Sequence, residues 1–248
     1  MSKNILITGA SSGLGEHMAR VFAARGHNLA LCARRTDRLE TLRAELLAAH
    51  PGIRVEIAAL DVNEHAAVFA VFQQFAEQFG SLDRVIVNAG IAQGRRVGTG
   101  HFETNLHTAQ TNFTAALAQC EAALEIFRKQ NSGHLVAISS VSAMRGMPRH
   151  LTVYAASKAG LALLMEGIQA ELINSPIKIT TLFPGYIRTE LNEGAGRLPF
   201  ELTAEDGARL LVDAIEQEVR QAFVPRWPWS LAGRAMKVLP LSLVAKLV

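Results

Sequence analysis

Residues 4–16 read NILITGASSGLGE, and this stretch decides the fold. A short apolar run leads into three glycines, Gly9, Gly13 and Gly15, and a segment with helical apolar spacing follows. Such a turn between a strand and a helix lets backbone N–H groups approach a pyrophosphate, because small residues keep side chains out of the way. The spacing is TGxxxGxG, which differs from the GxGxxG of the general dinucleotide fingerprint. We therefore expect the first βα unit of a nucleotide-binding α/β fold.

The rest of the chain alternates short apolar runs with longer segments of helical periodicity, which is typical of βαβ units and a parallel sheet. The predicted strands are residues 4–8, 28–33, 54–58, 84–88, 134–139, 178–183 and 222–224. Helices are expected in the intervals. At 248 residues the chain suits one large domain. The sequence therefore predicts an α/β protein with a doubly wound parallel sheet of about seven strands and helices on both faces.

Composition and charge exclude several classes of protein. Hydrophobic residues make up 49% and charged residues 19%, which indicates a globular chain. The net charge is +3 and the basic residues are scattered, so no nucleic-acid-binding surface is expected. Cys32 and Cys120 are far apart in apolar surroundings and the eight histidines do not cluster, so we expect buried thiols and no metal site. The N-terminus lacks the apolar core of a signal peptide, which favours a cytoplasmic location.

A second informative stretch, SSVSAMRGMPRHLTVYAASKAG, covers Ser139–Gly160. It holds Ser140, Tyr154 and Lys158, and a helix from about residue 151 would place the phenol and the ammonium on one face. A free tyrosine has a pKa of about 10, and a nearby cation lowers it. The Ser140 hydroxyl, at the end of the preceding strand, would hydrogen-bond the substrate oxygen that exchanges a proton with Tyr154 and hold it against the phenol. The pattern predicts a tyrosine acid/base assisted by a cation.

Together, TGxxxGxG after the first strand and a serine followed by YxxxK resemble the short-chain dehydrogenase/reductase family, over roughly residues 3–224. The resemblance implies a single-domain Rossmann fold and hydride transfer between a nicotinamide and a carbonyl or secondary alcohol carbon. It makes Tyr154 the catalytic acid/base, Lys158 the group that lowers its pKa and binds the nicotinamide ribose, and Ser140 the group that orients the substrate oxygen. Ser140 precedes Tyr154 by one residue more than is usual in the family, so Ser142 is an alternative.

Further motifs extend the resemblance. Asn112, in TNFTAAL, matches an asparagine that kinks a long helix and holds a water in the proton relay, so it is added to the predicted catalytic residues. A pair that flanks the adenine follows the third strand, and an NAG motif closes the fourth. A PGxxxT motif follows the sixth strand, where Ile187 and Thr189 would touch the nicotinamide amide. The predicted cofactor-binding residues are Gly9, Ser11, Ser12, Gly13, Leu14, Gly15, Arg34, Arg35, Asp61, Val62, Asn88, Ala89, Gly90, Tyr154, Lys158, Pro184, Gly185, Ile187 and Thr189.

The end of the second strand indicates which nicotinamide cofactor is preferred. NAD-preferring relatives carry an acidic residue there that binds the ribose 2′-hydroxyl. This sequence has Ala33 at that place and Arg34 next to it. An uncharged residue removes repulsion, and an arginine fork suits a 2′-phosphate. We therefore predict NADP(H), with Arg34 as the main determinant and Arg35 or Arg38 as secondary ones.

The substrate is less well marked by the sequence. Three variable segments, residues 91–100, 143–153 and the substrate loop 186–200, mix apolar residues with arginines. The apolar residues favour a hydrophobic carbonyl compound and its alcohol, and the arginines leave an anionic group as an alternative. A 3-oxoacyl-thioester reductase is the second candidate among enzymes. A non-catalytic NADP(H)-binding sensor or scaffold is the candidate from another class, although both the tyrosine and the lysine that such proteins usually lose are present.

The tail, residues 225–248, differs in composition from the predicted domain, residues 1–224. It reads PRWPWSLAGRAMKVLPLSLVAKLV, which combines two tryptophans and many aliphatic residues with four basic ones. Its charges and Pro240 do not suit a membrane span. A basic amphipathic segment of this kind either docks on the protein or a partner subunit, or lies on a membrane surface.

Two long helices are predicted near residues 111–128 and 153–172, and both carry apolar faces and small residues. In the family such helices pair across a two-fold axis. The resemblance therefore implies a homodimer or homotetramer.

Overall fold

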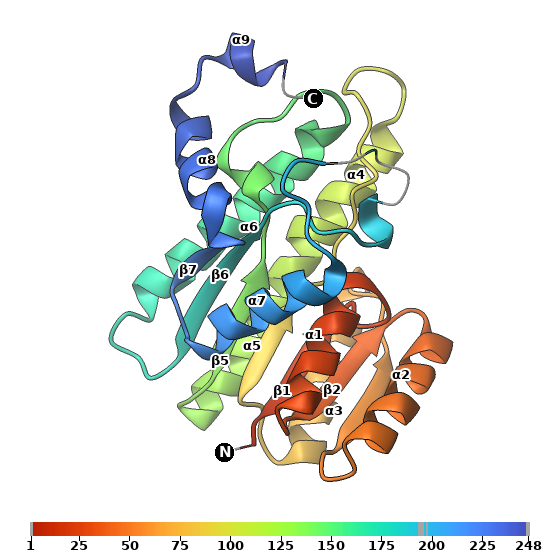
Figure 1. The fold of residues 1–248 in the computed structure, drawn as a ribbon. Coiled ribbons are helices and arrows are strands. Elements are labelled where there is room, and N and C mark those ends of the chain that lie inside the picture. Colours follow the sequence, from red (N-terminus) through yellow and green to blue (C-terminus); the bar gives the residue numbers. More distant parts are fainter. Residues whose placement is uncertain (1, 193–195, 197, 247–248) are drawn as a thin grey trace.

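The computed structural model describes residues 2–192, 196 and 198–246. Its centre is a seven-stranded parallel sheet in the order β3-β2-β1-β4-β5-β6-β7 (Figure 1). The strands are β1 (Asn4–Thr8), β2 (Asn28–Ala33), β3 (Val55–Ala59), β4 (Arg84–Val87), β5 (His134–Ile138), β6 (Lys178–Pro184) and β7 (Gln221–Val224). Each predicted strand is present, with both ends within one residue of the prediction. The predicted fold class, a doubly wound Rossmann sheet, is confirmed.

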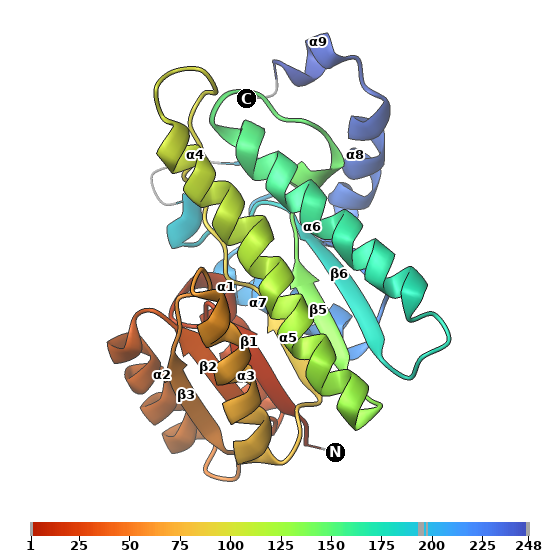
Figure 2. The same cartoon turned by 180° about the vertical axis from the view of Figure 1, so that it is seen from behind.

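Helices cover both faces of the sheet. One face carries α1 (Gly13–Ala24), α2 (Thr36–Ala49) and α7 (Ala204–Glu216), as Figure 1 shows. The opposite face, seen in Figure 2, carries α3 (His65–Phe79), α4 (Phe102–Ala109), α5 (Ala115–Gln130) and α6 (Thr152–Glu171). Shorter elements are the 3-10 helices η2 (Val141–Met144), η3 (Arg149–Leu151) and η4 (Glu190–Asn192), and the tail helices α8 (Arg226–Val238) and α9 (Leu241–Val244).

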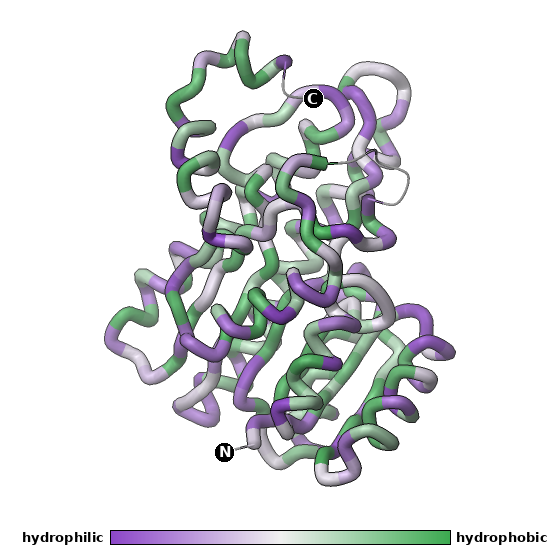
Figure 3. Tube along the Cα trace, in the orientation of Figure 1, coloured by the Kyte–Doolittle hydropathy of each residue, from purple (hydrophilic) through white to green (hydrophobic). Residues whose placement is uncertain are grey.

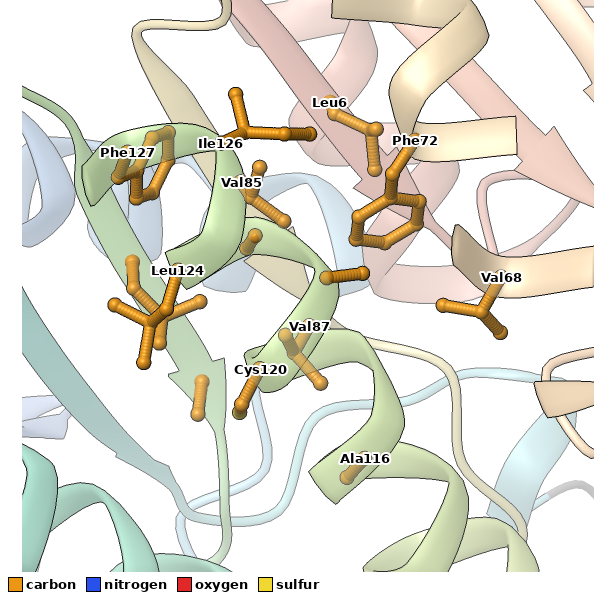
Figure 4. Packing of buried hydrophobic residues seen from close by; sticks show 14 of the residues in the cluster. Leu6, Val68, Phe72, Val85, Val87, Ala116, Cys120, Leu124, Ile126 and Phe127 are labelled. Carbon is orange, nitrogen blue, oxygen red and sulfur yellow. The ribbon is translucent and has the colours of Figure 1, made fainter. Parts of the chain in front are cut away.

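Each strand contributes to two hydrophobic clusters because successive side chains point to opposite faces of the sheet. In β1, Ile5 and Ile7 belong to the cluster under α1 and α7, whereas Leu6 belongs to the cluster under α3 and α5. Figure 4 shows this second cluster, in which Phe72 of α3 and Phe127 of α5 pack over the strands. Since both faces are covered, the strands are apolar on both sides.

The strand order reverses between β1 and β4, and the connections after these two strands run to opposite faces of the sheet. Open α/β sheets bind their ligands beyond the carboxyl ends of the strands at such a point. Both stretches that stand out in the sequence follow carboxyl ends: the glycine turn follows β1 and Ser140 follows β5. The topology therefore brings them to the same edge of the sheet.

The C-terminal tail packs on the rest of the chain. Trp229 and Gly233 of α8 are buried against β7 and η2, and Val244 of α9 is fully buried in a cluster with Ala155 of α6. Arg145 donates hydrogen bonds to two carbonyl oxygens at the C-terminal end of α8, both at 3.3 Å. These contacts support the interpretation that the tail docks on the protein itself.

One helical range among the described residues, Arg149–Glu171, is long and apolar enough to resemble a membrane span, with a mean hydropathy of 1.2. It includes α6, which packs against β6, η2 and α4. Core helices of globular proteins pass the same test of length and composition. The apolar window of this range is 28% buried, so packing within the chain accounts for part of its apolar character.

Candidate active site

The turn after β1 is shaped by its glycines. Gly9 and Gly13 have φ angles of 64° and 56°, in the left-handed region that favours glycine. A Cβ on Gly15 would overlap the carbonyl oxygen of Gly9, so the turn closes only because no side chain is present there. Helix α1 begins at Gly13, so its first N–H groups and the positive end of its dipole lie at this turn. The turn therefore forms a cradle for an anionic group.

The segment after β4 is tied to this turn through Thr8 and Asn88. Thr8 Oγ1 accepts hydrogen bonds from the backbone N–H groups of Asn88 and Ala89, at 3.0 and 3.1 Å. The Asn88 side-chain amide donates to Thr8 O at 2.9 Å. Ala89 lies close to Gly9 as well, since a Cβ built on Gly9 would be 2.9 Å from Ala89 Cα. The NAG motif therefore closes one side of the glycine turn.

Gly90 brings this motif up to two of the predicted catalytic side chains. A Cβ built on Gly90 would lie 3.1 Å from Asn112 Oδ1 and 3.3 Å from Lys158 Nζ. Real Cβ atoms seldom make contacts this short. The glycine therefore lets the amide and the ammonium approach the main chain at the end of β4.

Asn112 is buried in a π-helical turn, Gln110–Thr114, that joins α4 to α5. Its Oδ1 accepts from Ile91 N at 2.8 Å, and its Nδ2 donates to Ile91 O at 2.8 Å and to Ser157 Oγ at 3.3 Å. A π turn inserts an extra residue into a helix and is frequent at functional sites. The long helix predicted from residue 111 is therefore regular only from the start of α5, and Asn112 lies where the helix was expected to be kinked.

Lys158 is 5% exposed, and its ammonium donates a hydrogen bond to Ile138 O, at the end of β5, at 2.8 Å. The Ser139 hydroxyl donates to Lys158 O at 2.8 Å, which fixes this turn of α6 against the strand end. Burial lowers the pKa of Lys158 to about 8, because removal from water disfavours the charged form. This ammonium therefore loses its proton much more readily than that of an exposed lysine.

Tyr154 is half-buried one helical turn before Lys158, at the predicted spacing on α6. Burial raises the pKa of its phenol, and the hydrogen bond with Ser140 acts in the opposite direction. The sequence predicted that Lys158 would lower this pKa, but in the structure burial is the largest effect and the lowering effect comes from Ser140. The phenol therefore carries its proton at neutral pH.

The two candidate serines differ in what their side chains contact. Ser140 is buried, its hydroxyl lies beside the Tyr154 phenol, and it accepts a hydrogen bond from Ser142 N at 3.1 Å. This last contact caps η2 and holds the Ser140 side chain in place. Ser142 takes part through its backbone N–H. The geometry therefore favours Ser140 as the hydroxyl that meets a substrate oxygen.

Two arginines after β2 take different directions. The side chain of Arg34 is 61% exposed, and its Nη1 lies 3.8 Å from Asp61 Oδ2. Arg35 reaches back to the glycine turn and donates hydrogen bonds to the hydroxyls of its two serines, Ser11 at 3.3 Å and Ser12 at 2.6 Å. Both predicted arginines therefore lie next to predicted cofactor-binding residues.

Glu190 of η4 binds the same group of arginines from the substrate loop. Its carboxylate accepts a hydrogen bond from Arg35 Nη1 at 3.0 Å and forms an ion pair with Arg38. Hydrogen bonds from Arg38 and Arg35 lower the pKa of this carboxyl. Ion pairs therefore connect the predicted substrate loop to arginines next to the predicted cofactor-binding residues. The sequence did not indicate this contact.

The PGxxxT motif places one side chain at the glycine turn and another in the core. A Cβ built on Gly13 would lie 3.3 Å from Thr189 Cβ, so Thr189 borders the turn. The Ile187 side chain is buried against Gly207 of α7 and therefore belongs to the core. Residues 193–195 and 197 of the predicted substrate loop lie outside the described residues.

Most of the remaining residues predicted to bind the cofactor have side chains that pack in the interior or no side chain at all. Leu14, Val62 and Ala89 contribute side chains to the two hydrophobic clusters. Pro184 is the last residue of β6, and Gly185 packs directly against the indole of α8. Within the described ranges, no three His, Cys, Asp or Glu side chains are grouped as metal ligands.

Comparison with known proteins identifies the family. The model of the short chain dehydrogenase family matches residues 3–197. The chain is a short-chain dehydrogenase. A Mycobacterium tuberculosis protein named an uncharacterized oxidoreductase is 50% identical to it over 238 residues, which cover 96% of this chain and 94% of that protein. The family and the oxidoreductase class expected from the sequence are confirmed.

Solved structures of other short-chain dehydrogenases share the fold. A Sphingobium yanoikuyae short-chain dehydrogenase in complex with NADPH is 28% identical, with a TM-score of 0.83 over 99% of this chain and 96% of that one. A Burkholderia phymatum short-chain dehydrogenase/reductase in complex with NAD has a TM-score of 0.85 over 100% of this chain and 96% of that one. Its identity of 23% supports the fold alone.

Three residues of this short-chain dehydrogenase belong to the site although the sequence did not single them out: Thr8, Ser157 and Glu190. Thr8 is the threonine of TGxxxGxG, so the motif itself held that signal. Ser157 lies between Tyr154 and Lys158, on a face of α6 that only the packing of Asn112 reveals. Glu190 is far along the chain from the arginines it binds, and no local pattern connects them.

Proposed function

We propose that this short-chain dehydrogenase uses NADP(H) to interconvert a hydrophobic carbonyl compound and its secondary alcohol. The observation that carries the proposal is that Ser140 hydrogen-bonds Tyr154, one helical turn from the buried ammonium of Lys158. That ammonium lies against Gly90, in the segment that closes one side of the glycine turn. Gly9, Gly13 and the start of α1 fit a dinucleotide pyrophosphate, and a bound nicotinamide would supply or accept the hydride. A relative that is 28% identical binds NADPH, which supports a nicotinamide cofactor.

Tyr154 is suited to act as the acid in the reducing direction. Because burial raises its pKa, the phenol keeps its proton at neutral pH and can pass it to a carbonyl oxygen as negative charge develops there. Ser140 orients the same oxygen by a hydrogen bond. In the oxidising direction Tyr154 must first lose its proton, so alkaline pH favours alcohol oxidation.

Lys158 and Asn112 form the route by which Tyr154 regains a proton. Both groups lie against Gly90, so the ammonium and the amide are neighbours. The lowered pKa of Lys158, about 8, makes its ammonium a better proton donor than an exposed lysine. Asn112 holds its amide in place through Ile91, which leaves the group rigid enough to position a water.

The preference for NADP(H) rests on the end of β2. Ala33 is buried and uncharged, so no carboxylate occupies the place that would bind a ribose 2′-hydroxyl. Arg34 gives up only a 3.8 Å ion pair with Asp61 to reach a 2′-phosphate, whereas Arg35 is held by the turn serines and Glu190. Arg34 is therefore the main determinant of the proposal and Arg35 a secondary one.

The decisive experiment measures NADPH and NADH consumption against hydrophobic ketones, aldehydes and 3-oxoacyl thioesters. Tyr154→Phe should lower turnover at least about 100-fold, the usual contribution of a positioned acid. Its Kd for NADPH should stay within about threefold of the wild type, which separates loss of chemistry from loss of binding. Turnover close to wild type in Tyr154→Phe would refute the proposed mechanism.

Cofactor choice is tested by the ratio of kcat/KM with NADPH to that with NADH. Arg34→Ala should lower this ratio by about 10-fold or more, because a charge-assisted contact to phosphate is lost. Arg54→Ala is the matched control, since it removes one exposed positive charge at the amino end of β3, the opposite end of the sheet from Arg34. An Arg34→Ala enzyme with an unchanged ratio contradicts the assignment.

The alternative functions predict other outcomes on the same panel. Preference for thioesters would identify a 3-oxoacyl-thioester reductase, but Arg145, one of the arginines that leave an anionic substrate as an alternative, is engaged with the end of α8. Tight NADPH binding without turnover on any compound would favour the sensor or scaffold.

We also propose self-association through α5 and α6. A groove with a volume of about 620 Å³ runs between their outer faces, lined in part by Leu117, Leu163 and Ile168. Leu163 is 67% exposed, and exposed apolar surface of this kind marks protein contacts. Light scattering should give a multiple of the 26.8 kDa chain mass, and Leu163→Arg should reduce it to a single chain.

A further inference from the structure

Helix α8 is apolar on two opposite sides, although only one of them is buried. Trp229, Gly233 and Met236 face the rest of the chain. Leu231 and Val238 lie on the opposite side at helical spacing and are 60% and 82% exposed. Packing explains the inner side of α8. The outer side has no partner among the described residues.

Exposed apolar residues also occur before and after the regular turns of α8. Trp227 is 71% exposed at the start of the helix, and Leu241 of α9 is 66% exposed. Figure 1 shows α8 and α9 at the edge of the molecule, and Figure 3 shows hydrophobic residues along the same outer tail. We call this set, Trp227, Leu231, Val238 and Leu241, the outer apolar strip. Exposed apolar residues gathered along one outer segment mark an interaction site.

The charged residues of the tail that carries the outer apolar strip are all of one sign. Residues 219–248 contain Arg220, Arg226, Arg234, Lys237 and Lys246, and no aspartate or glutamate. At about 100° per residue, Arg234 lies about 60° around α8 from Leu231, so a cation flanks the strip. The surface therefore combines an exposed tryptophan, aliphatic side chains and an uncompensated positive charge.

We propose that the outer apolar strip binds the surface of an anionic lipid bilayer. Basic residues attract anionic headgroups, while tryptophan and leucine enter the boundary between headgroups and acyl chains. A second copy of the chain fits less well, because a two-fold interface pairs the surface with itself and brings like charges together. An anionic bilayer offers an apolar environment to the exposed apolar residues and negative headgroups to the basic ones.

The position of the strip has a consequence for catalysis, which rests on the proposed function. The inner side of α8 packs on Gly185, and α9 packs on Ala155, the residue after Tyr154. A bilayer bound at the strip is therefore separated from the segment around Tyr154 by the tail helices. An apolar carbonyl compound dissolved in the lipid would reach the site from that surface.

The first test is co-sedimentation with vesicles. The wild-type chain should bind vesicles of phosphatidylglycerol and phosphatidylcholine, bind pure phosphatidylcholine at least about 10-fold more weakly, and dissociate at high salt. Leu231→Ser should weaken binding to the anionic vesicles about 10-fold. The matched control is Ile173→Ser, which removes an aliphatic residue that is 62% exposed at the far end of α6 and should change nothing.

Fluorescence provides a second measurement, because the chain has two tryptophans. In Trp229→Phe the remaining Trp227 should shift to shorter emission wavelength when anionic vesicles are added. In Trp227→Phe the remaining Trp229 is already buried, so its emission should stay unchanged. Tyr154→Phe should bind vesicles like the wild type, so a failure of the catalytic proposal remains distinct from a failure of this one.

Three results would overturn the proposal. The first is no binding to anionic vesicles by the folded wild-type chain, and the second is equal binding by Leu231→Ser and Ile173→Ser. The third is a fall in molar mass of Leu231→Ser without lipid, which would assign the strip to a second copy of the chain. Circular dichroism of each variant establishes that the fold is retained.

Discussion

Lys158 and Arg84 are both buried cations, but they lie at opposite ends of the same sheet. Lys158 is at the carboxyl end, where its ammonium donates to Ile138 O beside Asn112 and Gly90. Arg84 opens β4 at the amino end and is 0% exposed. Burying a cation is costly in either place. The two sites differ in the contacts that stabilise the buried charge.

Arg84 is held by polar side chains that lie near the amino ends of the neighbouring strands β5 and β6. Its Nε donates to His134 Nδ1 at 2.9 Å, and His134 Nε2 lies 2.8 Å from Thr180 Oγ1. Its two terminal nitrogens have no hydrogen-bond partner among the described residues, and Glu218 Oε1 lies 3.8 Å away. The Phe22 ring packs against the guanidinium, at 5.9 Å from its centroid. The contacts fix β4, β5 and β6 relative to one another.

The difference between the two ends follows from the chemistry of the two cations. A guanidinium keeps its charge in proteins, so Arg84 can position neighbours but cannot exchange protons. A buried ammonium gives up its proton more easily, and the pKa of Lys158 is about 8. The amino end is therefore suited to holding the sheet together and the carboxyl end to chemistry.

The largest expected effect on turnover is that of Lys158→Met. Turnover should fall by about 10²- to 10⁴-fold, because the proposed proton relay to Tyr154 is lost. The melting temperature should stay equal to the wild type or rise, since a methionine fills similar space without a buried charge. Steady-state kinetics and thermal melts measure the two quantities on the same preparation. A loss of stability with full activity would reverse the roles assigned to the two ends.

Arg84→Ala should have the opposite profile. The free energy of unfolding should fall by about 3 kcal/mol, because a cavity forms and His134 loses its donor. The folded variant should keep turnover within about twofold of the wild type, as Arg84 lies at the far end of the sheet. Urea unfolding measures the first quantity and turnover at low temperature the second. A large fall in turnover of the folded variant would show that the two ends are coupled.

The amino end should also make the fold sensitive to acid. Burial, followed by the charges of Arg84, Lys3 and Lys178, lowers the pKa of His134 to about 3. As the pH falls below about 6.5, the unfolded chain takes up a proton that the folded chain refuses until about pH 3, so stability is lost across this window. At pH 5 the loss is about 2 kcal/mol.

The measurement is the free energy of unfolding at several pH values for His134→Asn and the wild type. The variant should lose less stability between pH 7 and pH 5 than the wild type does. His101→Asn, which replaces an exposed histidine, is the control and should follow the wild type. Equal pH dependence in all three proteins would rule out His134 as the source.

The sequence predicted the strands and the carboxyl end of the sheet because their signals are local. The glycine turn and the Tyr154–Lys158 spacing each lie within a short stretch of chain. The amino end was not predicted, since Arg84 and His134 are neighbours only through the register of β4 and β5. The direction predicted for the Tyr154 pKa differs from that in the structure for a related reason: spacing indicates a nearby cation but not the burial that is the largest effect on this phenol.

The smallest predicted effect concerns the two serines beside Tyr154, and it tests how far the carboxyl end depends on single atoms. Ser140→Ala should lower turnover about 10-fold, because the hydroxyl that orients the substrate oxygen is lost. Ser142→Ala should lower it by less than about threefold, since Ser142 acts through its backbone N–H. Ser140→Ala also removes the cap of η2, which Ser142→Ala keeps, so thermal melts of both variants separate loss of that cap from loss of substrate orientation. A larger loss of turnover in Ser142→Ala than in Ser140→Ala would identify Ser142 as the residue that orients the substrate oxygen.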